Sequence, residues 1–287
     1  KLDDQLAAVH PETRRRLDEA GFDEKHFKDL AASLTEGDAA TRRRARNAVK
    51  GEVRPPPPGA LAKLPAVGTP EYERLRALGQ AALERGELAF CTMAGGMATR
   101  MGGIVKALAE VAPGHTFLSM RLAENRTASE RAGRPVPLWL MTSDATHDDL
   151  EAALKKANAP SHVKLFMQNL SLRLHPNGEL FTTEDNEPST HATGHGDLID
   201  ALRRAGLLAD FVDNGGKYVW ITNVDNLGAS IDDAILGFFV DEAGKGVDVL
   251  CEVCPKAGDK GGIPVHAEGK VQVLEEFRLP EGFDPAT

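Results

Sequence analysis

The sequence predicts an α/β fold with a mixed, mainly parallel central sheet, helices on both faces of that sheet, and a small helical segment in front of it. Two observations lead to this prediction. From about residue 88 onward, short apolar runs typical of buried strands alternate with the periodicity of amphipathic helices. The first 50 residues show helical periodicity alone.

The N-terminal segment is expected to form three helices. Pro11 suits the first turn of the second of them. The prolines at 55–58 then make a stiff, extended linker. We therefore divide the chain into residues 1–60, a helical segment with a proline-rich linker, and residues 61–287, the main domain. The apolar faces of the three helices are marked by Leu2, Leu6, Val9, Phe27, Leu30 and Leu34.

The main domain alternates strands and helices. In a parallel sheet, ligands bind at the carboxyl ends of the strands, so the residues directly after each strand are the candidates for function. Strands are expected at 88–93, 136–141, 163–167, 218–223 and 248–254, with a hairpin of 263–265 and 271–274 around Glu268-Gly269. A helix is expected at 116–132, and a second one begins at a capping box of Thr146 and Asp149. Two further helices are expected, one around Leu198, Ile199 and Leu202 and one at 231–241.

Composition narrows the possible functions. A chain of 287 residues with 41% hydrophobic content can bury a sizeable core, and the net charge of −9 argues against general nucleic-acid binding. No apolar run approaches the ~20 residues of a membrane span. We expect Cys251 and Cys254 to be structural, because a strand would point them to opposite faces. So few cysteines favour a reducing, cytoplasmic setting.

A glycine-rich loop directly follows the first strand of the predicted sheet. Its glycines let a ligand approach the backbone, and Arg100 and Lys106 add two cations, which together suit a bound polyphosphate. Neither the P-loop nor the dinucleotide fingerprint fits the spacing. An ordinary turn between strand and helix explains the glycines alone equally well. The glycines are Gly95, Gly96, Gly102 and Gly103.

Polar candidates follow other strands. Asp225 lies between the amides of Asn223 and Asn226 and is placed to hold Mg²⁺ beside a triphosphate, although a turn-forming role would also explain it. Gln168 offers both a donor and an acceptor, as an imide edge such as that of uracil requires. The Gly-His-Gly-Asp run at 194–197 is expected to form a turn entering a helix, where backbone amides can approach a base or a phosphate.

The order of these pieces along the chain resembles that of the UDP-glucose pyrophosphorylases, also called UTP–glucose-1-phosphate uridylyltransferases, which are nucleotide-sugar pyrophosphorylases. The resemblance covers about residues 88–287. The matching motifs are Gly95-Gly96-x-x-Thr99-x-Met101-Gly102, Phe166-x-Gln168 with Arg173, Gly194-His195-Gly196-Asp197, Asn223-x-Asp225-Asn226-Leu227-Gly228-Ala229, Glu252-Val253-x-Pro255-Lys256, Lys260-Gly261-Gly262, and Glu268-Gly269-Lys270-Val271 with Leu274-Glu275.

The resemblance implies a Rossmann-like, GT-A-like nucleotidyltransferase fold, and it leads us to expect that the catalytic domain continues past residue 287. It implies that Lys106 and Arg100 are the catalytic cations and that Mg²⁺ at Asp225 is the cofactor. The nucleotide-binding residues that it implies are Gly95, Gly96, Gln168, His195, Gly196 and Asp225. The implied sugar-binding residues are Asn223, Gly262 and Glu275.

The implied reaction makes UDP-glucose and pyrophosphate from UTP and glucose-1-phosphate, by in-line attack on the α-phosphorus. The expected partners are UTP and a sugar-1-phosphate, without nucleic acid or membrane, and the oligomeric state stays open. Three alternatives remain: the same chemistry on N-acetylglucosamine-1-phosphate, a glycosyltransferase of related fold, and a non-catalytic UDP-sugar-binding module. Lys260-Gly261-Gly262 resembles the glucose enzymes, and Val224-Asp225-Asn226 lacks the Asp-x-Asp pair usual in glycosyltransferases.

Overall fold

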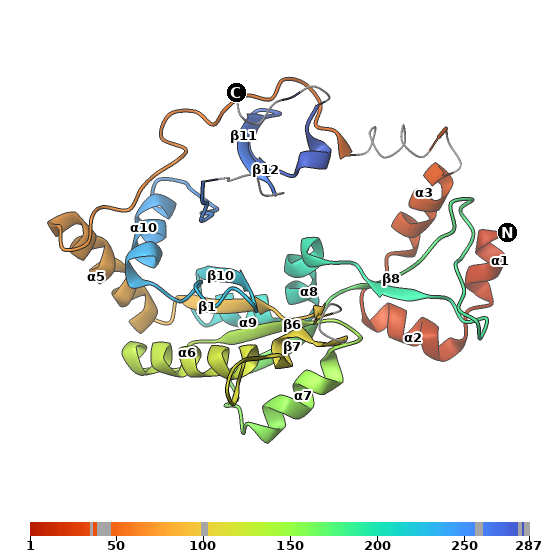
Figure 1. Ribbon diagram of the computed structural model, residues 1–287, viewed down its shortest axis with the longest axis horizontal. Coiled ribbons are helices and arrows are strands. Elements are labelled where there is room, and N and C mark those ends of the chain that lie inside the picture. Colours follow the sequence, from red (N-terminus) through yellow and green to blue (C-terminus); the bar gives the residue numbers. More distant parts are fainter. Residues whose placement is uncertain (35–36, 39–46, 99–102, 256–260, 281–282, 284–287) are drawn as a thin grey trace.

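A computed structural model describes residues 1–34, 37–38, 47–98, 103–255, 261–280 and 283 of the chain. Its centre is a sheet of four parallel strands in the order β10-β1-β6-β7 (Figure 1). Three of the strands match their predicted ranges, and the fourth lies at 138–142 instead of 136–141. The strands are β1 (Leu88–Met93), β6 (Leu138–Thr142), β7 (Val163–Met167) and β10 (Tyr218–Asn223).

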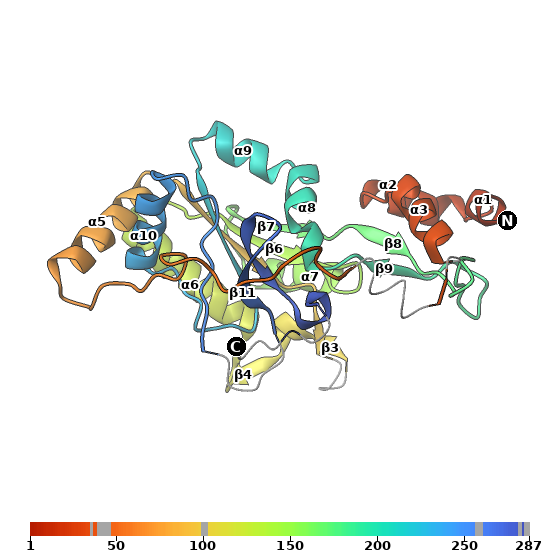
Figure 2. The same ribbon diagram turned by 90° about the horizontal axis from the view of Figure 1, so that it is seen from above.

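Helices cover both faces of this sheet, as predicted (Figures 1 and 2). Because side chains alternate along a strand, Leu88 and Phe90 of β1 join the core on one face, and Ala89 and Cys91 join the core on the other. The first face is covered by α5 (Pro70–Glu84), α6 (Phe117–Ala132), α7 (His147–Lys156) and α10 (Asp233–Ala243). The second is covered by α8 (Leu198–Arg204) and α9 (Leu207–Asp213).

Helices α5 and α10 approach each other closely because two glycines lie in their contact. A Cβ atom added to Gly79 would lie 1.8 Å from the carbonyl oxygen of Asp233. One added to Gly237 would lie 1.8 Å from the carbonyl oxygen of Leu75. Any side chain at either position would therefore push the two helices apart.

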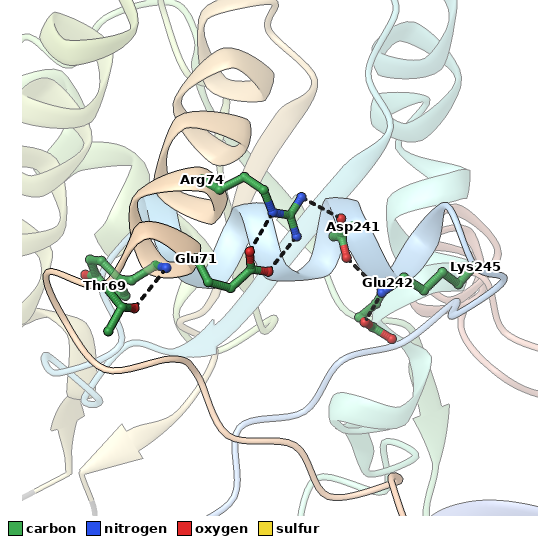
Figure 3. A network of polar contacts seen from close by, with 7 residues as sticks. Thr69, Glu71, Arg74, Asp241, Glu242 and Lys245 are labelled. Carbon is green, nitrogen blue, oxygen red and sulfur yellow. Dashed lines mark hydrogen bonds and ion pairs between the residues drawn. The ribbon is translucent and has the colours of Figure 1, made fainter.

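A polar network spans the same helix contact (Figure 3). Arg74 pairs with Asp241 at 2.9 Å and with Glu71 of its own helix at 2.8 Å, while Lys245 pairs with Asp241 and Glu242, both at 2.8 Å. Exposed ion pairs of this kind contribute only ~0–1 kcal/mol each. Helix packing at the glycines, more than these charges, fixes the position of α10 against α5.

Short antiparallel pairs form separately from the main sheet within the described residues. The hairpin predicted around Glu268-Gly269 is confirmed, and both of these turn residues have positive φ, 51° and 79°. The pairs are β2 (Met97–Ala98) with β3 (Ile104–Val105), β4 (Glu110–Ala112) with β5 (His115–Thr116), β8 (Leu170–Leu172) with β9 (Thr190–Ala192), and β11 (Ile263–Ala267) with β12 (Lys270–Leu274). The 3₁₀ turns are η2 (Lys106–Leu108), η3 (His195–Asp197) and η4 (Glu276–Arg278).

The N-terminal segment is helical, as predicted, and it packs on the β8–β9 insertion at one end of the molecule (Figures 1 and 2). Leu6, Leu17 and Phe27 share a core with Leu170 and Leu172 of β8. The main domain therefore completes the core of this segment, and the boundary at residue 60 remains a prediction. The helices are α1 (Leu2–Ala7), α2 (Pro11–Glu19) and α3 (Glu24–Leu34).

The β11–β12 hairpin forms a separate small core with the stretch 47–54. Val49 packs with Val265 and Leu274. The backbones of Arg54 and His266 exchange hydrogen bonds of 3.0 and 2.9 Å. This unit lies apart from the four-stranded sheet in Figure 1, so its position depends on residues that precede the main domain.

Two predictions about local structure are wrong. Residues 248–254 form no strand, because nothing among the described residues pairs with them, and all of their side chains are exposed. Cys251 and Cys254 are therefore exposed free thiols instead of strand residues. At the start of α7, the hydroxyl of Thr146 forms no cap on the helix, because it accepts a hydrogen bond from the N–H of Ser143 at 3.0 Å.

Candidate active site

The carboxyl ends of the parallel strands meet at one edge of the sheet, and most predicted site residues lie there. β1 leads into the glycine loop at Gly95, β7 into Gln168, and β10 into Asp225. The register pairs Met93, the last residue of β1, with Asn223, the last residue of β10. Residues from distant parts of the sequence therefore converge on this edge, as expected for a parallel sheet.

Lys106 and Asp225 form an ion pair at this edge, with 2.5 Å between Nζ and Oδ2. The glycine loop sets the position of the lysine, because the N–H of Lys106 donates to the carbonyl of Gly96 at 3.0 Å. The two side chains are 39% and 37% exposed, so both remain accessible to a ligand. Sequence reasoning predicted both residues but not their contact. Arg100, the other predicted cation, lies outside the described residues.

Gln168 lies against the backbone of the glycine loop. Gln168 is only 4% exposed, and its backbone N–H donates to the carbonyl of Thr142 at 2.9 Å. A Cβ atom added to Gly95 would lie 2.4 Å from Gln168 Nε2 and 2.9 Å from the backbone nitrogen of Ser143. Glycine at 95 thus lets the loop approach both neighbouring strand ends, and the amide of Gln168 is held next to the loop.

Ser143 is a residue of this edge that sequence reasoning missed. Directly after β6, its hydroxyl donates to the carbonyl of Gly95 at 2.8 Å. Ser143 is 6% exposed, and its backbone N–H donates to the hydroxyl of Thr146, which is fully buried. The signal was available, because a serine follows a predicted strand end just as Gln168 does.

The β8–β9 hairpin returns the chain to the same edge. At its end, the N–H of Thr193 donates to the carbonyl of Asn169, the residue after Gln168, at 3.0 Å. The chain then passes Gly194, which has φ of 105°, into η3. The expected turn into a helix is present. His195 and Gly196 are exposed there, and a Cβ atom at Gly196 would meet nothing within 4 Å.

The predicted sugar-binding residues fall into two groups. Asn223 is exposed at the end of β10. Gly262 and Glu275 are neighbours in the β11–β12 unit, where a Cβ atom at Gly262 would lie 3.5 Å from Glu275 Oε1 and 2.6 Å from Val273 Cγ1. Within the described part of the chain, no hydrogen bond or ion pair joins these two to Asn223. Their common role in sugar binding remains a prediction.

The donor set at the sheet edge suits Mg²⁺ better than a metal that needs many protein ligands. In the described residues, no group of three or more His, Cys, Asp or Glu side chains could hold a metal ion. Asp225 offers one accessible carboxylate, with the amide of Asn223 two residues before it. Mg²⁺ is commonly bound by one or two carboxylates together with substrate phosphates and water. Asp225 therefore fits the expected cofactor.

The sheet, its glycine loop and the polar groups at the strand ends place the domain in the class of Rossmann-like nucleotidyltransferase folds. A family profile described as UTP–glucose-1-phosphate uridylyltransferase matches residues 37–283. The chain belongs to this family, which confirms the resemblance inferred from its motifs.

Curated relatives with this description come from plants, a yeast and a slime mould. The chain is 34% identical over 209 residues to the UTP–glucose-1-phosphate uridylyltransferase of Musa acuminata, which is 68% of this chain and 43% of the relative. It is 31% identical over 202 residues to that of Saccharomyces cerevisiae, with coverages of 68% and 40%. The chain thus aligns with less than half of the length of these relatives.

Solved structures share the fold. A UDP-N-acetylglucosamine pyrophosphorylase from Trypanosoma brucei in complex with an inhibitor superposes with a TM-score of 0.71 at 21% identity, covering 94% of this chain and 62% of that one. A UDP-glucose phosphorylase from Trypanosoma brucei has a TM-score of 0.67 at 23% identity, with coverages of 93% and 56%. At this level of identity, the likeness establishes the α/β architecture with its N-terminal helices.

Proposed function

We propose that this chain carries a Mg²⁺-dependent uridylyltransferase site, which makes UDP-glucose and pyrophosphate from UTP and glucose-1-phosphate. The observation that carries the proposal is the Lys106–Asp225 pair beside the glycine loop and Gln168. A cation and a carboxylate in contact at the carboxyl edge suit a metal-bound triphosphate. Membership of the uridylyltransferase family supports the same reaction.

Gln168 and the glycine loop would bind the nucleotide. Gln168 is only 4% exposed, and its side-chain nitrogen lies close to Gly95 of the glycine loop. An amide presents a donor and an acceptor together, which matches the imide edge of uracil. The exposed backbone at Gly96 and Gly196 would approach the base and the phosphates, with His195 next to Gly196, and Gly95 would bring the loop against the Gln168 amide.

Lys106 and Asp225 would share the charge of the reacting phosphates. Mg²⁺ held by Asp225 would supply neutralisation of phosphate charge and help to orient the triphosphate. Lys106 stabilises the negative charge that shifts toward pyrophosphate as the bond to the α-phosphorus breaks, and Arg100 is its proposed partner. The sugar phosphate is already an anion. The reaction therefore needs no protein base and no covalent intermediate, only positioning and charge neutralisation.

The sugar is proposed to lie near Asn223, Gly262 and Glu275. The β11–β12 unit, which holds the last two of these, is fixed by residues 47–54. The position of this unit relative to the sheet edge would therefore decide the room for the sugar. Glucose-1-phosphate is the proposed acceptor, and N-acetylglucosamine-1-phosphate is the alternative.

We place the activity in the cytoplasm. All three cysteines are free thiols, and burial raises the pKa of Cys91 to about 12, so that this thiol stays protonated and unreactive. Free thiols suit a reducing compartment. In the part of the chain that the structure describes, no helix is both long and apolar enough to cross a bilayer.

The decisive experiment measures pyrophosphate release by the purified chain from UTP and Mg²⁺ with a panel of sugar-1-phosphates. We expect release with glucose-1-phosphate, little release without a sugar phosphate, and little with CTP in place of UTP. Release only with N-acetylglucosamine-1-phosphate would select the alternative substrate. Binding of UDP-glucose without any pyrophosphate release would identify a non-catalytic binding module and contradict the proposal.

A further inference from the structure

Arg121 on α6 is the most buried charged side chain among the described residues. It is 1% exposed, and its guanidinium carbon lies 5.4 Å from the centre of the Phe90 ring. A buried charge is unfavourable unless its hydrogen-bonding groups are matched by partners. The partners of Arg121 therefore show which part of the molecule this charge holds in place.

Those partners lie in the loop that follows β10. Nη1 of Arg121 donates to the carbonyl of Ala229 at 2.9 Å, and Nη2 donates to the carbonyl of Asn226. Nη1 also pairs with Glu124, one turn along α6. Glu124 in turn accepts a hydrogen bond from the N–H of Ile231 at 3.1 Å. Two side chains of one helix thus hold three backbone groups of the stretch 226–231, which begins directly after Asp225.

The same helix also holds the turn that carries Lys106. The first residue of α6, Phe117, donates its N–H to the carbonyl of Ala109 at 3.2 Å, and Ala109 donates to the carbonyl of Lys106 at 3.0 Å. A reciprocal capping box of Thr116 and Ser119 fixes the start of the helix. The N-terminal half of α6 is therefore a common support for both members of the Lys106–Asp225 pair.

We propose that Arg121, together with Glu124, is a positioning residue that fixes Asp225 relative to Lys106 for phosphate and metal binding. This inference rests on the proposed function. Arg121 would act on Asp225 through the backbone of the loop that follows it. Its planar guanidinium reaches two carbonyl groups and one carboxylate at once, which a lysine ammonium on a flexible stem does not reproduce. Asp225 would keep its chemistry but lose its fixed position if Arg121 were replaced.

The test compares Arg121→Lys with a matched control, Arg131→Lys. Arg131 lies on the same helix and also reaches the end of this loop, through the carbonyl of Ile231 at 3.0 Å and Asp233 at 3.3 Å, but its side chain is 43% exposed and contacts neither Asn226 nor Ala229. Both variants keep the positive charge. Hydrogen exchange of the 224–231 amides reports the loop without any substrate, and pyrophosphate release as a function of Mg²⁺ concentration reports the site.

In Arg121→Lys we expect faster exchange across 224–231 with unchanged exchange in β1. We also expect a higher half-saturating Mg²⁺ concentration and a kcat lower by about 10- to 100-fold, the loss expected when a reacting group is misplaced by about 1 Å. Arg131→Lys should leave all three near wild type. Equal effects in both variants, or normal exchange and normal Mg²⁺ dependence in Arg121→Lys, would overturn the inference.

A second pair covers the case in which Arg121→Lys does not fold. Glu124→Gln keeps one oxygen that can accept from Ile231 but turns an NH₂ group toward Arg121, whereas Glu124→Ala removes both acceptors. The alanine variant should therefore loosen 224–231 and raise the Mg²⁺ requirement more than the glutamine variant does, and wild-type exchange in the alanine variant would contradict the inference. If the wild-type chain releases no pyrophosphate, the proposed function fails, while the exchange comparison still decides whether Arg121 and Glu124 hold this loop.

Discussion

The two edges of the four-stranded sheet are built in opposite ways. At the amino edge, Glu87 is 5% exposed and is held by Arg85 at 2.8 Å and Lys217 at 2.6 Å. Its carbonyl also accepts from the N–H groups of Lys217 and Tyr218, which ties the starts of β1 and β10 together. At the carboxyl edge, the glycine loop carries the half-exposed Lys106–Asp225 pair, and the nearly buried Ser143 and Gln168 lie against that loop.

Other contacts at the amino edge follow the same pattern. Asn125 is 3% exposed, donates to the carbonyl of Val136 at 2.9 Å, and contacts His162 at 3.0 Å. Burial lowers the pKa of His162, so this imidazole favours its neutral form. The polar groups of this edge are thus occupied by one another. The comparison teaches that one edge serves the stability of the sheet, while the other leaves its polar groups to a ligand.

The largest expected effect at the carboxyl edge is that of Asp225→Ala. We expect Mg²⁺-dependent turnover to fall by about 10³-fold or more, because the proposed metal ligand and the partner of Lys106 are both lost. The melting temperature should barely change, since an exposed ion pair contributes only ~0–1 kcal/mol. Kinetic assays and thermal melts of the same preparations check both statements.

Asp232→Ala is the matched control for that variant. Asp232 lies seven residues later and caps α10 by accepting from the N–H groups of Ala234 and Ile235 at 2.8 and 2.9 Å. Its loss should lower stability by about 1 kcal/mol and leave the Mg²⁺ dependence unchanged. If Asp225→Ala instead lowered stability and kept turnover, Asp225 would be a turn former, and the contrast between the edges would break.

Lys106→Ala should lower kcat by about 10²- to 10³-fold with only a modest change in KM. The backbone of the glycine loop still holds the nucleotide in this variant, so the loss falls on the transition state. Steady-state kinetics of Arg100→Ala provide the internal comparison, as either cation could be the principal one. A normal kcat with a raised KM in Lys106→Ala, or a loss seen only in Arg100→Ala, would contradict the role given to Lys106.

Glu87→Gln tests the amino edge. Arg85 and Lys217 lower the pKa of Glu87 from its ordinary value of 4.5 to about 2. A carboxylate with a lowered pKa in the folded state stabilises it above the unfolded pKa, and this contribution disappears as the pH falls from about 4.5 to about 2. We expect Glu87→Gln to lower the unfolding free energy at pH 7 by on the order of 1–3 kcal/mol. Solvent screening keeps the loss in this range, because Arg85 and Lys217 are both over half exposed.

Urea unfolding of Glu87→Gln at pH 7 and near pH 3 measures this effect. The gap between wild type and variant should narrow at the lower pH, while kcat at moderate temperature stays normal. Glu84→Gln, an exposed position near the end of α5, is the matched control and should change neither quantity. A loss of activity in Glu87→Gln without a loss of stability would mean that the amino edge also takes part in the chemistry.

Gln168→Ala should have the smallest effect. Leaving the polar edge of uracil unpaired costs roughly 0.5–1.5 kcal/mol, which is a fall in UTP affinity of about 2- to 10-fold. Discrimination between UTP and CTP should narrow at the same time. Calorimetric titration with both nucleotides measures the two quantities. The exposed Gln80→Ala is the control, and wild-type affinity and selectivity in Gln168→Ala would remove the base-recognition role from this edge.

Much of the sheet could be predicted because the strands of a parallel sheet covered by helices appear in the sequence as short apolar runs. The strands β1, β7 and β10 lie where these runs do. The run at 248–254 is also rich in apolar residues but forms no strand, because a sequence pattern does not show whether a neighbouring strand is present. Whether such a segment forms a strand depends on a hydrogen-bonding partner in the fold, and not on its apolar character alone.

The site could be predicted where a residue lies within two positions of a strand end, as Gln168 and Asp225 do. Gly262 and Glu275 came from family resemblance alone, and the structure brings the two together without linking them to the sheet edge. Arg121 could not be predicted, because a charged residue in an amphipathic helix is normally solvated and only the fold shows that it is buried.

The most direct test of the account is a double-mutant cycle on Lys106 and Asp225, measured as kcat/KM for pyrophosphate release with saturating Mg²⁺. If the two side chains act as one centre at the carboxyl edge, the double variant Lys106→Ala with Asp225→Ala should be about as active as the less active of the two single variants. Losses that multiply in full would mean that the two residues act independently, and would contradict a shared phosphate and metal site.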